Sequence, residues 1–200
     1  RRPPAEIWGG YGRNNRKNIK KAGREGLEVL IEETPRRVAE FKSVYRHTLE
    51  RNRAGDFYYF DDRFFDYIHN RLQGHFAYAY TCKDGVVVSA ELLLFNKTYL
   101  HSFLGGTLEQ FYYCRPNNIL KHEAIKWAKD RGIKYFLLGG GRRDNDGIFR
   151  YKRSFAQDGV VDFYVGKKVH DSAAAAMLNG IAAARQPHKT EGFFPAYRRC

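Results

Sequence analysis

Apolar residues recur along the chain with two different periods, and these periods predict its helices and strands. Over residues 38–49 and again over residues 64–72, the apolar positions fall three or four residues apart, which is typical of helices that bury one face. Thr34-Pro35 indicates the start of the first helix, as a capping residue followed by a proline, and Ala54-Gly55 indicates its end. The second helix is expected to begin after Asp61.

In the region that follows, apolar and polar residues alternate as they do in the strands of an antiparallel sheet. The predicted strands are His75–Thr81, Val86–Phe95 and Thr98–Leu104, joined by turns at Asp84-Gly85 and Asn96-Lys97. Asp-Gly between alternating apolar residues is one of the stronger local signals for a hairpin. These residues therefore predict three adjacent antiparallel strands.

A helix and a further strand come next. After a loop over Gly105–Pro116, Asn117 is expected to cap a helix that runs to Arg131 and stops at Gly132. Lys134–Leu138 then predicts a short buried strand. Because a strand, a helix and a strand in succession favour a right-handed crossover, the strands on either side of this helix are expected to be parallel.

The two ends of the chain supply shorter elements. Asn14–Arg24 predicts a basic helix, capped by Asn14 or Asn15 and stopped by Gly26, and Leu27–Ile31 predicts a strand. Later in the chain we expect a strand that closes the sheet, a helix and a tail, at Val160–Val165, Ala173–Ala184 and Gln186–Cys200. The whole pattern predicts an α+β fold with a mixed, mostly antiparallel sheet flanked by helices.

Composition and charge narrow the classes of partner. With 200 residues, of which 43% are hydrophobic, the chain is expected to form one core with extensions. Its net charge of +13 favours an anionic partner such as tRNA, a nucleotide-linked substrate or an anionic lipid head group at a membrane surface. The alternative is that the excess of lysine and arginine serves only solubility.

The predicted basic helix concentrates this positive charge. No acidic residue interrupts the six cations between Arg13 and Arg24. A face of this kind suits phosphate groups, so Arg16, Lys17, Lys20 and Lys21 are candidate nucleic-acid contacts. Such a face is equally typical of a helix that is simply solvated.

The sequence shows no sign of a membrane span, a leader or a metal site. No apolar run approaches the ~18 residues that cross a bilayer, and Arg1-Arg2-Pro3-Pro4 does not lead into an apolar stretch, so we expect a cytoplasmic protein. Three cysteines without Cys-x-x-Cys spacing fit a reducing compartment. His122-Glu-Ala-Ile-Lys126 has a lysine where a zinc protease helix needs histidine, so no metal is expected there. No cofactor is expected either.

The stretch from Gly139 to Phe155 contains the strongest candidate chemistry. Gly139, Gly140, Gly141 and Arg142 follow a strand end, where residues without a Cβ let the backbone approach a ligand. Lys152 comes shortly afterwards, flanked by Tyr151 and Phe155. Taken alone, the glycines also fit an ordinary turn and Lys152 an ordinary surface position.

Together with the segments that precede it, this stretch resembles the Fem family of aminoacyltransferases, a branch of the GNAT-like acyltransferases. The resemblance covers most of residues 13–170. The segments that carry it are, in order, Asn15–Ala22, Gly26–Val29, Phe103–Thr107, Arg115–Leu120, Glu123–Ala128, Arg131–Ile133, Asp146-Gly147 and Tyr151–Phe155. One departure is Tyr151, where the family pattern has phenylalanine.

The resemblance implies a GNAT-like fold and a division of the chain into three parts. Residues 1–33 would be a basic linker helix and strand left from a preceding GNAT-like half, residues 34–171 the acyltransferase domain, and residues 172–200 a C-terminal helix and tail. Because the family normally has such a preceding half and the first residue is not methionine, we expect the chain to be a fragment.

The resemblance also implies a reaction. Fem-type enzymes transfer an aminoacyl group from tRNA to an amine, expected here to belong to an anionic peptidoglycan precursor. Direct attack by the amine needs no protein nucleophile, whereas a cation would stabilise the tetrahedral oxyanion. This role falls to Lys152, with Tyr151 either stacking on the terminal adenine or packing under the lysine stem.

A base would take the proton of the attacking ammonium. The nearest candidates are Asp144, Asp146 and Glu123, with Glu109 as a weaker one. Asp146 precedes Gly147 and also fits an Asx-type turn, which is the better interpretation of its position.

Arg115 and Asn117 mark a difference from the GNAT enzymes that depend on coenzyme A. A phosphate at this helix start could meet both a guanidinium and free backbone N–H groups. The coenzyme A enzymes usually have a glycine-rich pyrophosphate loop here, and Arg115-Pro-Asn-Asn118 counts against acetyl-CoA without excluding another thioester. Two alternatives stay open: an N-acyltransferase that uses an acyl-CoA or acyl-carrier thioester, and a non-catalytic domain that binds nucleic acid.

Overall fold

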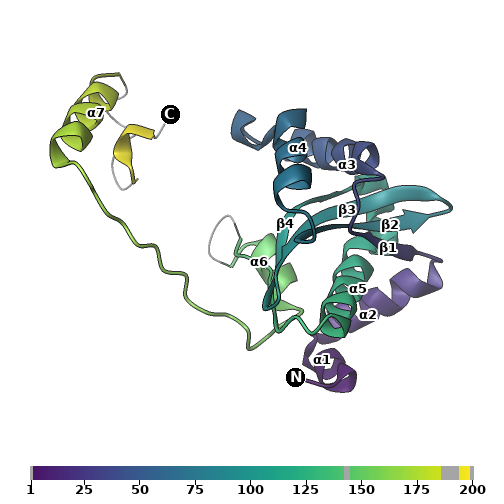
Figure 1. Cartoon of the computed structure of the whole chain (residues 1–200). Helices are drawn as coiled ribbons and strands as arrows, with labels where there is room; N and C mark the ends of the chain where they lie inside the picture. Colours follow the sequence, from purple (N-terminus) through teal and green to yellow (C-terminus); the bar gives the residue numbers. More distant parts are fainter. Residues whose placement is uncertain (1, 142–144, 186–193, 199–200) are drawn as a thin grey trace. The chain divides into compact units, whose positions relative to one another are not determined.

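The computed structural model describes residues 2–141, 145–185 and 194–198 (Figure 1). The chain divides into two compact units, Arg1–Val160 and Val161–Cys200. The first unit contains a five-stranded sheet, and all the residues that carry the family resemblance up to Phe155 belong to it.

The strands of this sheet lie side by side in chain order. They are β1 Glu28–Glu32, β2 Phe76–Lys83, β3 Val86–Phe95, β4 Tyr99–Thr107 and β5 Tyr135–Leu137. The three pairs formed among β1 to β4 are antiparallel, and β5 is parallel to β4. The helices of the unit are α1 Pro4–Gly10, α2 Arg13–Arg24, α3 Val38–Arg51, α4 Asp62–Arg71, α5 Pro116–Asp130 and α6 Gly147–Arg153, with short 3-10 turns at Asp56–Tyr58 and Glu109–Cys114.

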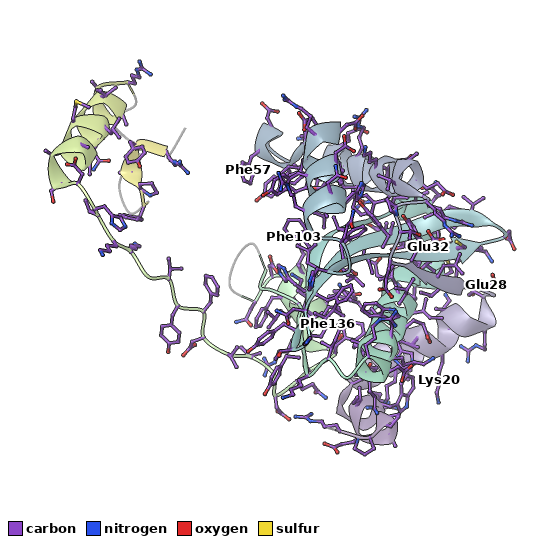
Figure 2. All side chains as sticks on the ribbon, viewed as in Figure 1. Lys20, Glu28, Glu32, Phe57, Phe103 and Phe136 are labelled. Carbon is purple, nitrogen blue, oxygen red and sulfur yellow. The ribbon has the colours of Figure 1, made fainter. Side chains whose placement is uncertain are left out.

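Alternating side chains build one core on each face of the sheet. On one face Tyr78 and Tyr80 of β2 pack with Phe41 of α3, and on the other Leu93 of β3 packs with Leu120 of α5. Figure 1 shows α3 and α4 on one side of the sheet, with α5 and α2 on the other. Phe103 belongs to the first core and Phe136 to the second (Figure 2). This three-layered, mostly antiparallel arrangement confirms the predicted fold class.

Two turns join the antiparallel strands where the sequence predicts them. Asp84 and Gly85 both have positive φ, +50° and +81°, as a two-residue hairpin of type I′ requires. At the next turn the Asn96 side-chain oxygen accepts hydrogen bonds from the N–H groups of Thr98 and Tyr99, each at 2.8 Å. Both hairpins are therefore fixed by residues within the turns themselves.

The basic helix α2 begins earlier than the sequence predicts, because neither Asn14 nor Asn15 caps it. Gly12 is the N-cap residue, and Asn15 is buried within the helix at 2% exposure. The Asn15 amide donates to the Ser154 carbonyl at 3.3 Å and accepts from Asn118 at 2.8 Å, and the Gly12 N–H donates to the same Ser154 carbonyl at 2.7 Å. Asn15 thus ties α2 to α5 and to the end of α6.

The predicted start of α3 at Thr34-Pro35 is wrong. The Arg36 N–H donates to the Thr34 carbonyl at 2.9 Å, which closes a separate turn around Pro35. The helix begins at Val38, with Arg37 as its N-cap residue. A proline after a threonine therefore marks a turn here and not the first turn of the helix.

The strand predicted over Lys134–Leu138 exists, but it is shorter and is not buried. It covers Tyr135–Leu137, and Tyr135 and Leu137 are 56% and 47% exposed. The strand lies at the edge of the sheet, so only one of its neighbours is a strand. An apolar run in the sequence cannot distinguish such an edge from the middle of a sheet.

Val160–Val165 does not form the strand that was expected to close the sheet. The segment has no strand partner among the described residues, and Val161 and Phe163 are 83% and 89% exposed. An extended segment becomes a strand only when a neighbour shares its backbone hydrogen bonds, so apolar content alone was misleading. In the second unit, α7 Ser172–Arg185 confirms the predicted alanine-rich helix. No described helix is both long and apolar enough to cross a bilayer.

Candidate active site

The two parallel strands separate after a short paired stretch, and this separation opens a cleft. β4 and β5 are aligned at three positions, from Tyr99 with Tyr135 to His101 with Leu137. Beyond them, residues 102–107 of β4 have no strand on that side among the described residues. A cleft of about 480 Å³, here called the central cleft, lies along this half of β4 and is also lined by residues 89–91 of β3 and by side chains of α3, α5 and α6.

Gly106 of β4 lets α3 pack closely beside the central cleft. A Cβ on Gly106 would lie 2.5 Å from the Thr48 hydroxyl oxygen and 2.7 Å from a carbonyl oxygen of α3. In this arrangement the Thr107 N–H donates to the Thr48 hydroxyl at 3.0 Å, and Arg51 donates to the Thr107 carbonyl at 2.8 Å. Gly105 and Gly106 both belong to β4 and pair with Glu91 and Ala90 of β3, although the sequence pattern assigned them to a loop.

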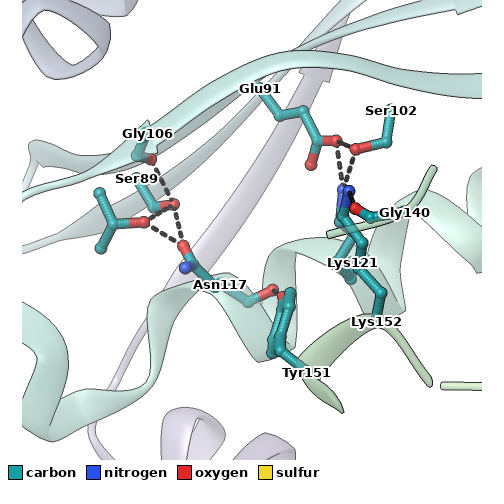
Figure 3. Close-up of polar contacts among 10 residues, drawn as sticks. Ser89, Glu91, Ser102, Gly106, Asn117, Lys121, Gly140, Tyr151 and Lys152 are labelled. Carbon is teal, nitrogen blue, oxygen red and sulfur yellow. Dashed lines mark hydrogen bonds and ion pairs between the residues drawn. The ribbon is translucent and has the colours of Figure 1, made fainter. Parts of the chain in front are cut away.

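Lys152 reaches the central cleft from α6 and is half-buried. Its ammonium donates to the Gly140 carbonyl at 2.7 Å (Figure 3). Gly139 has a φ of +70°, a conformation that favours glycine, and a Cβ there would lie 3.5 Å from the same ammonium nitrogen. Burial, followed by the nearby Lys121 ammonium, lowers the pKa of Lys152. The structure thus brings the predicted lysine and the predicted glycines together.

Asp146 supports the start of α6. Its side chain accepts a hydrogen bond from the Phe149 N–H at 2.7 Å, as a helix N-cap does. The same carboxylate lies so close to Gly141 that a Cβ at this position would collide with it. Asp146 therefore has the turn-forming role that was preferred for it, and Gly141 is the residue that makes room for the cap.

Tyr151 and Asn117 lead to a cluster of hydroxyl groups at one end of the cleft. The Tyr151 hydroxyl donates to the Asn117 backbone carbonyl at 2.9 Å, and burial raises the pKa of Tyr151 far above its usual value. The Asn117 side-chain oxygen contacts the hydroxyls of Ser89, at 2.8 Å, and of Thr107. Asn117 was expected to cap α5, but the N-cap residue is Arg115, at a φ of +61°. The Asn117 amide is instead part of the cleft wall.

A buried ion pair that the sequence interpretation missed lies at the floor of the central cleft. Glu91 of β3 and Lys121 of α5 form a salt bridge, with side chains only 7% and 8% exposed. Ser102 of β4 joins them, since its hydroxyl donates to Glu91 and accepts from Lys121 at 2.6 Å (Figure 3). Burial lowers the pKa of Lys121, and Glu91 opposes this shift. One signal was available: Ser89 and Glu91 are the polar residues of Val86–Phe95 and, at strand spacing, they share a face.

Phe155, predicted to bind substrate, packs in an aromatic cluster and does not line the central cleft. Its ring centroid lies 5.4 Å from that of Tyr11. The Tyr11 hydroxyl is 3.2 Å from His122 Nδ1, and the Trp8 ring packs against His122 at 5.3 Å. Burial lowers the pKa of His122. This cluster attaches α1 and the start of α2 to α5.

Three other residues that were predicted to act in the site, Arg115, Glu123 and Glu109, lie outside the central cleft. Arg115 is exposed at the start of α5 and is not among the cleft residues. Glu123 forms an ion pair with a lysine of the same helix at 2.7 Å, and Glu109 faces Arg51 at 3.9 Å. Arg142 and Asp144 lie outside the described residues. These roles stay predictions.

The basic side chains of α2 differ in their hydrogen bonds and in their exposure to solvent. Arg16 donates to the carbonyls of Gly9, at 2.9 Å, and of Tyr11, so it holds the junction between α1 and α2. Lys17 and Lys20 are exposed and Lys21 is partly buried, and Figure 2 shows Lys20 projecting from the helix. A nucleic-acid contact through these lysines stays a prediction.

A second cleft, of about 530 Å³, lies between α3 and the start of α4. Most of its charged side chains are paired with one another, Lys42 with Asp62 at 2.7 Å and Arg63 with Asp61 at 2.8 Å. It contains none of the residues that were predicted to act in catalysis. The central cleft, which contains Lys152 and Tyr151, is therefore the candidate active site.

Comparisons with known proteins agree with this fold. Residues 11–153 match the acetyltransferase (GNAT) domain family, and a search of curated proteins found no match. The structure of FemX is similar at a TM-score of 0.69 and 15% identity, over 77% of this chain and 56% of FemX, so the chain spans little more than half of that protein.

Two further solved structures have the same fold. An aminoglycoside acetyltransferase from an uncultured soil metagenomic sample, in complex with sisomicin, is similar at a TM-score of 0.56 and 13% identity, over 71% of this chain and 97% of the other. The C-terminal domain of a putative lysylphosphatidylglycerol synthetase from Agrobacterium fabrum is similar at a TM-score of 0.50 and 18% identity, over 63% and 40%. At such identities these structures support the fold alone. The family match, however, extends over well more than half of the sequence, and the chain therefore belongs to the GNAT acetyltransferase domain family.

Proposed function

We propose that this chain is the GNAT-like part of a Fem-type aminoacyltransferase, which transfers an amino acid from aminoacyl-tRNA to an amine of a peptidoglycan precursor. The observation that carries the proposal is the position of Lys152, whose side chain lines the central cleft beside the half of β4 that has no partner on the β5 side among the described residues. A cation in this position can face a carbonyl group while an amine attacks it.

The proposed reaction forms one bond and breaks another. The amine nitrogen attacks the carbonyl carbon of the ester, and the carbonyl oxygen acquires negative charge. The bond to the ribose oxygen then breaks, and this oxygen gains the proton that the amine loses. Holding both substrates in one cleft supplies much of the rate, and a donor aimed at the oxyanion typically contributes ~3–4 kcal/mol. Lys152, as an ammonium, is that donor.

The open edge of β4 supports acyl transfer more generally. Residues 102–107 line the cleft and have no strand partner on the β5 side among the described residues. An extended substrate can add to such an edge through backbone hydrogen bonds. Amide groups of a peptide-like acceptor and those of a coenzyme A arm both suit it, so this feature supports the reaction class without selecting the donor.

The start of α5 favours a tRNA-linked donor over coenzyme A. Pro116, the first helical residue, has no N–H, and the Asn118 N–H already donates to the Arg115 carbonyl at 3.1 Å. Residues 107–115 contain no glycine that would let the backbone wrap a phosphate. This helix start offers a phosphate fewer free backbone donors than were expected from the sequence, and it is a poor site for a pyrophosphate.

The second candidate is an N-acyltransferase that takes its acyl group from coenzyme A or a carrier thioester. The family to which the chain belongs favours it, as does the similarity in fold to an aminoglycoside acetyltransferase. The same cleft and the same lysine would serve this reaction. A third candidate, a domain that binds nucleic acid without catalysis, depends on the exposed lysines of α2.

Transfer assays with two donors separate these candidates. The full-length protein is given either labelled aminoacyl-tRNA or labelled acetyl-CoA, with a peptidoglycan precursor as acceptor. We expect transfer from the tRNA ester and a loss of roughly 100-fold or more in Lys152→Met, which keeps the apolar stem of the side chain. Lys126→Met is the matched control, because it removes the same charge from an exposed position on α5.

Each contrary result identifies a different error. Transfer from acetyl-CoA alone would replace the proposal by the N-acyltransferase. Binding of tRNA without transfer from either donor would favour the third candidate. Near-normal turnover by a folded Lys152→Met variant, with thermal unfolding as the check on folding, would return Lys152 to the ordinary surface lysines.

A further inference from the structure

The buried ion pair beside Lys152 has no part in the reaction as described so far. We propose that Lys121, fixed in place by Glu91 and Ser102, is a positioning residue that sets how firmly Lys152 holds its proton and hence the pH range in which Lys152 can act. This inference deepens the proposed function and rests on it for its catalytic meaning.

Lys121 has little freedom to move. Its ammonium forms the salt bridge to Glu91 of β3 and donates to the Ser102 hydroxyl of β4 at 2.6 Å. It also lies 5.3 Å from the ring centroid of Phe136 in β5. Contacts from three strands therefore hold this nitrogen in one position under the cleft, and its charge is fixed relative to the sheet.

Lys152 lies within the influence of that fixed charge. Lys121 comes from α5 and Lys152 from α6, and both line the central cleft. Figure 3 shows the two side chains reaching toward the same region, near Glu91 and Gly140. After burial itself, the Lys121 ammonium is the main cause that lowers the pKa of Lys152, while Glu91 acts in the opposite direction. A fixed positive charge near the half-buried Lys152 disfavours the protonated form of its side chain.

Asp146 and His101 also interact electrostatically with Lys152. Asp146, at the start of α6, favours its ammonium form. His101 of β4 lies near enough that Lys152, after burial, lowers the pKa of its imidazole. Asp146 caps α6 and His101 is exposed, whereas Lys121 and Glu91 are both buried. The buried pair is thus the part of this surrounding charge that solvent and salt screen least.

A weakened hold on the proton suits the proposed reaction. A lysine in open solvent keeps its proton far above neutral pH, and enzymes bring lysines into a useful range by burial and by neighbouring cations. Lys152 in this state can stabilise the oxyanion and then give its proton to the departing ribose oxygen. It regains a proton from the nitrogen that has become the new amide, so no proton is gained or lost overall.

The titration of Lys152 can be measured without any substrate. In the full-length protein, brief labelling with acetic anhydride over a pH series, followed by mass spectrometry of the peptides, gives the pH midpoint at which each lysine becomes reactive. We expect the midpoint of Lys152 to lie below that of exposed Lys20. It should move upward in Lys121→Met and downward in Glu91→Gln, and it should not move in Lys126→Met.

Opposite shifts are the result that a merely structural pair would not give, because loss of packing would disturb both variants without moving the midpoint in two directions. If Lys121→Met does not fold, Lys121→Gln, which keeps a hydrogen-bond donor for Glu91 and Ser102, takes its place, and only an upward shift of the Lys152 midpoint fits. Unmoved midpoints in folded variants, or shifts in the same direction, would overturn the inference. A protein with the opposite shifts but no transfer from either donor would instead overturn the proposed function and leave the control of the Lys152 proton standing.

Discussion

Removing one member of the Lys121–Glu91 pair is expected to destabilise the first unit far more than removing both. Each side chain is less than one tenth exposed, so Lys121→Met leaves a carboxylate without its counterion and Glu91→Leu leaves an ammonium. Breaking a buried pair in this way costs about 3–5 kcal/mol, whereas replacing both members by apolar residues is often neutral. Ser102 loses partners in either case, which adds about 1–3 kcal/mol if its hydroxyl stays unpaired.

These magnitudes define a double-mutant cycle. The single variants should each lose about 3–5 kcal/mol and the double variant about 0–3 kcal/mol, so the coupling energy should be on the order of 3 kcal/mol or more. Urea unfolding gives the free energies, and thermal unfolding should show the single variants lower by roughly 6–20 °C. Lys126→Met, which breaks an exposed pair, should change stability by less than about 1 kcal/mol.

Two results would refute this reasoning. Single variants within about 1 kcal/mol of the unmodified chain would mean that water reaches the pair. A double variant as unstable as the sum of the two singles would mean that Lys121 and Glu91 do not interact, and the Lys121 charge would then lack the fixed position that its proposed effect on Lys152 requires.

Gly106→Ala is expected to destabilise the first unit by about 1–3 kcal/mol, because its Cβ would overlap the Thr48 hydroxyl, whereas Gly23→Ala, in open space within α2, should stabilise it by about 0.5–1 kcal/mol. Urea unfolding compares the two, and a neutral Gly106→Ala would contradict the close packing of α3 on β4. A change from pH 7 to pH 5 should loosen the packing of α1 on α5. Burial lowers the pKa of His122 in the folded chain, so the unfolded chain binds the proton first as the pH falls. The stability that neutral His122 contributes above about pH 6.5 is therefore lost at lower pH. Hydrogen-exchange protection of α1 tests this, and protection that does not change between these pH values would disprove it. Reversing the charges of Lys17 and Lys20 should reduce the log–log salt dependence of tRNA binding by about 0.7–0.9 for each lost phosphate contact, and an unchanged slope would make this face an ordinary solvated surface.

Much of the fold could be predicted because it depends on residues that are close in sequence. The Asp84-Gly85 hairpin is set by two residues that tolerate positive φ. The parallel β5 could be expected because a strand, a helix and a strand in succession usually form a crossover between parallel strands. The strand predicted over Val160–Val165 was wrong, because a strand needs a neighbouring strand and no local sequence pattern reveals whether one is present. The predicted start of α3 was wrong, because Thr34-Pro35 is compatible with a separate turn as well as with the first turn of a helix.

The residues of the candidate site also differ in whether they could be predicted from the sequence. Lys152 and the glycines of the preceding loop could be predicted, because they belong to one short stretch of sequence. The pairing of Glu91 with Lys121 could not, since the two residues are 30 positions apart and each resembles an ordinary polar position on a strand or a helix. Their contact depends on how β3, β4 and α5 pack together, and such packing is visible only in three dimensions.

The bonds from Gly12 and Asn15 to the Ser154 carbonyl have a consequence for how this domain can be built into larger proteins. They join the two ends of the segment that matches the family, residues 11–153. The first and last residues of the domain therefore lie next to each other and are connected by hydrogen bonds. A domain whose ends meet tolerates circular permutation and insertion into another chain with short joints.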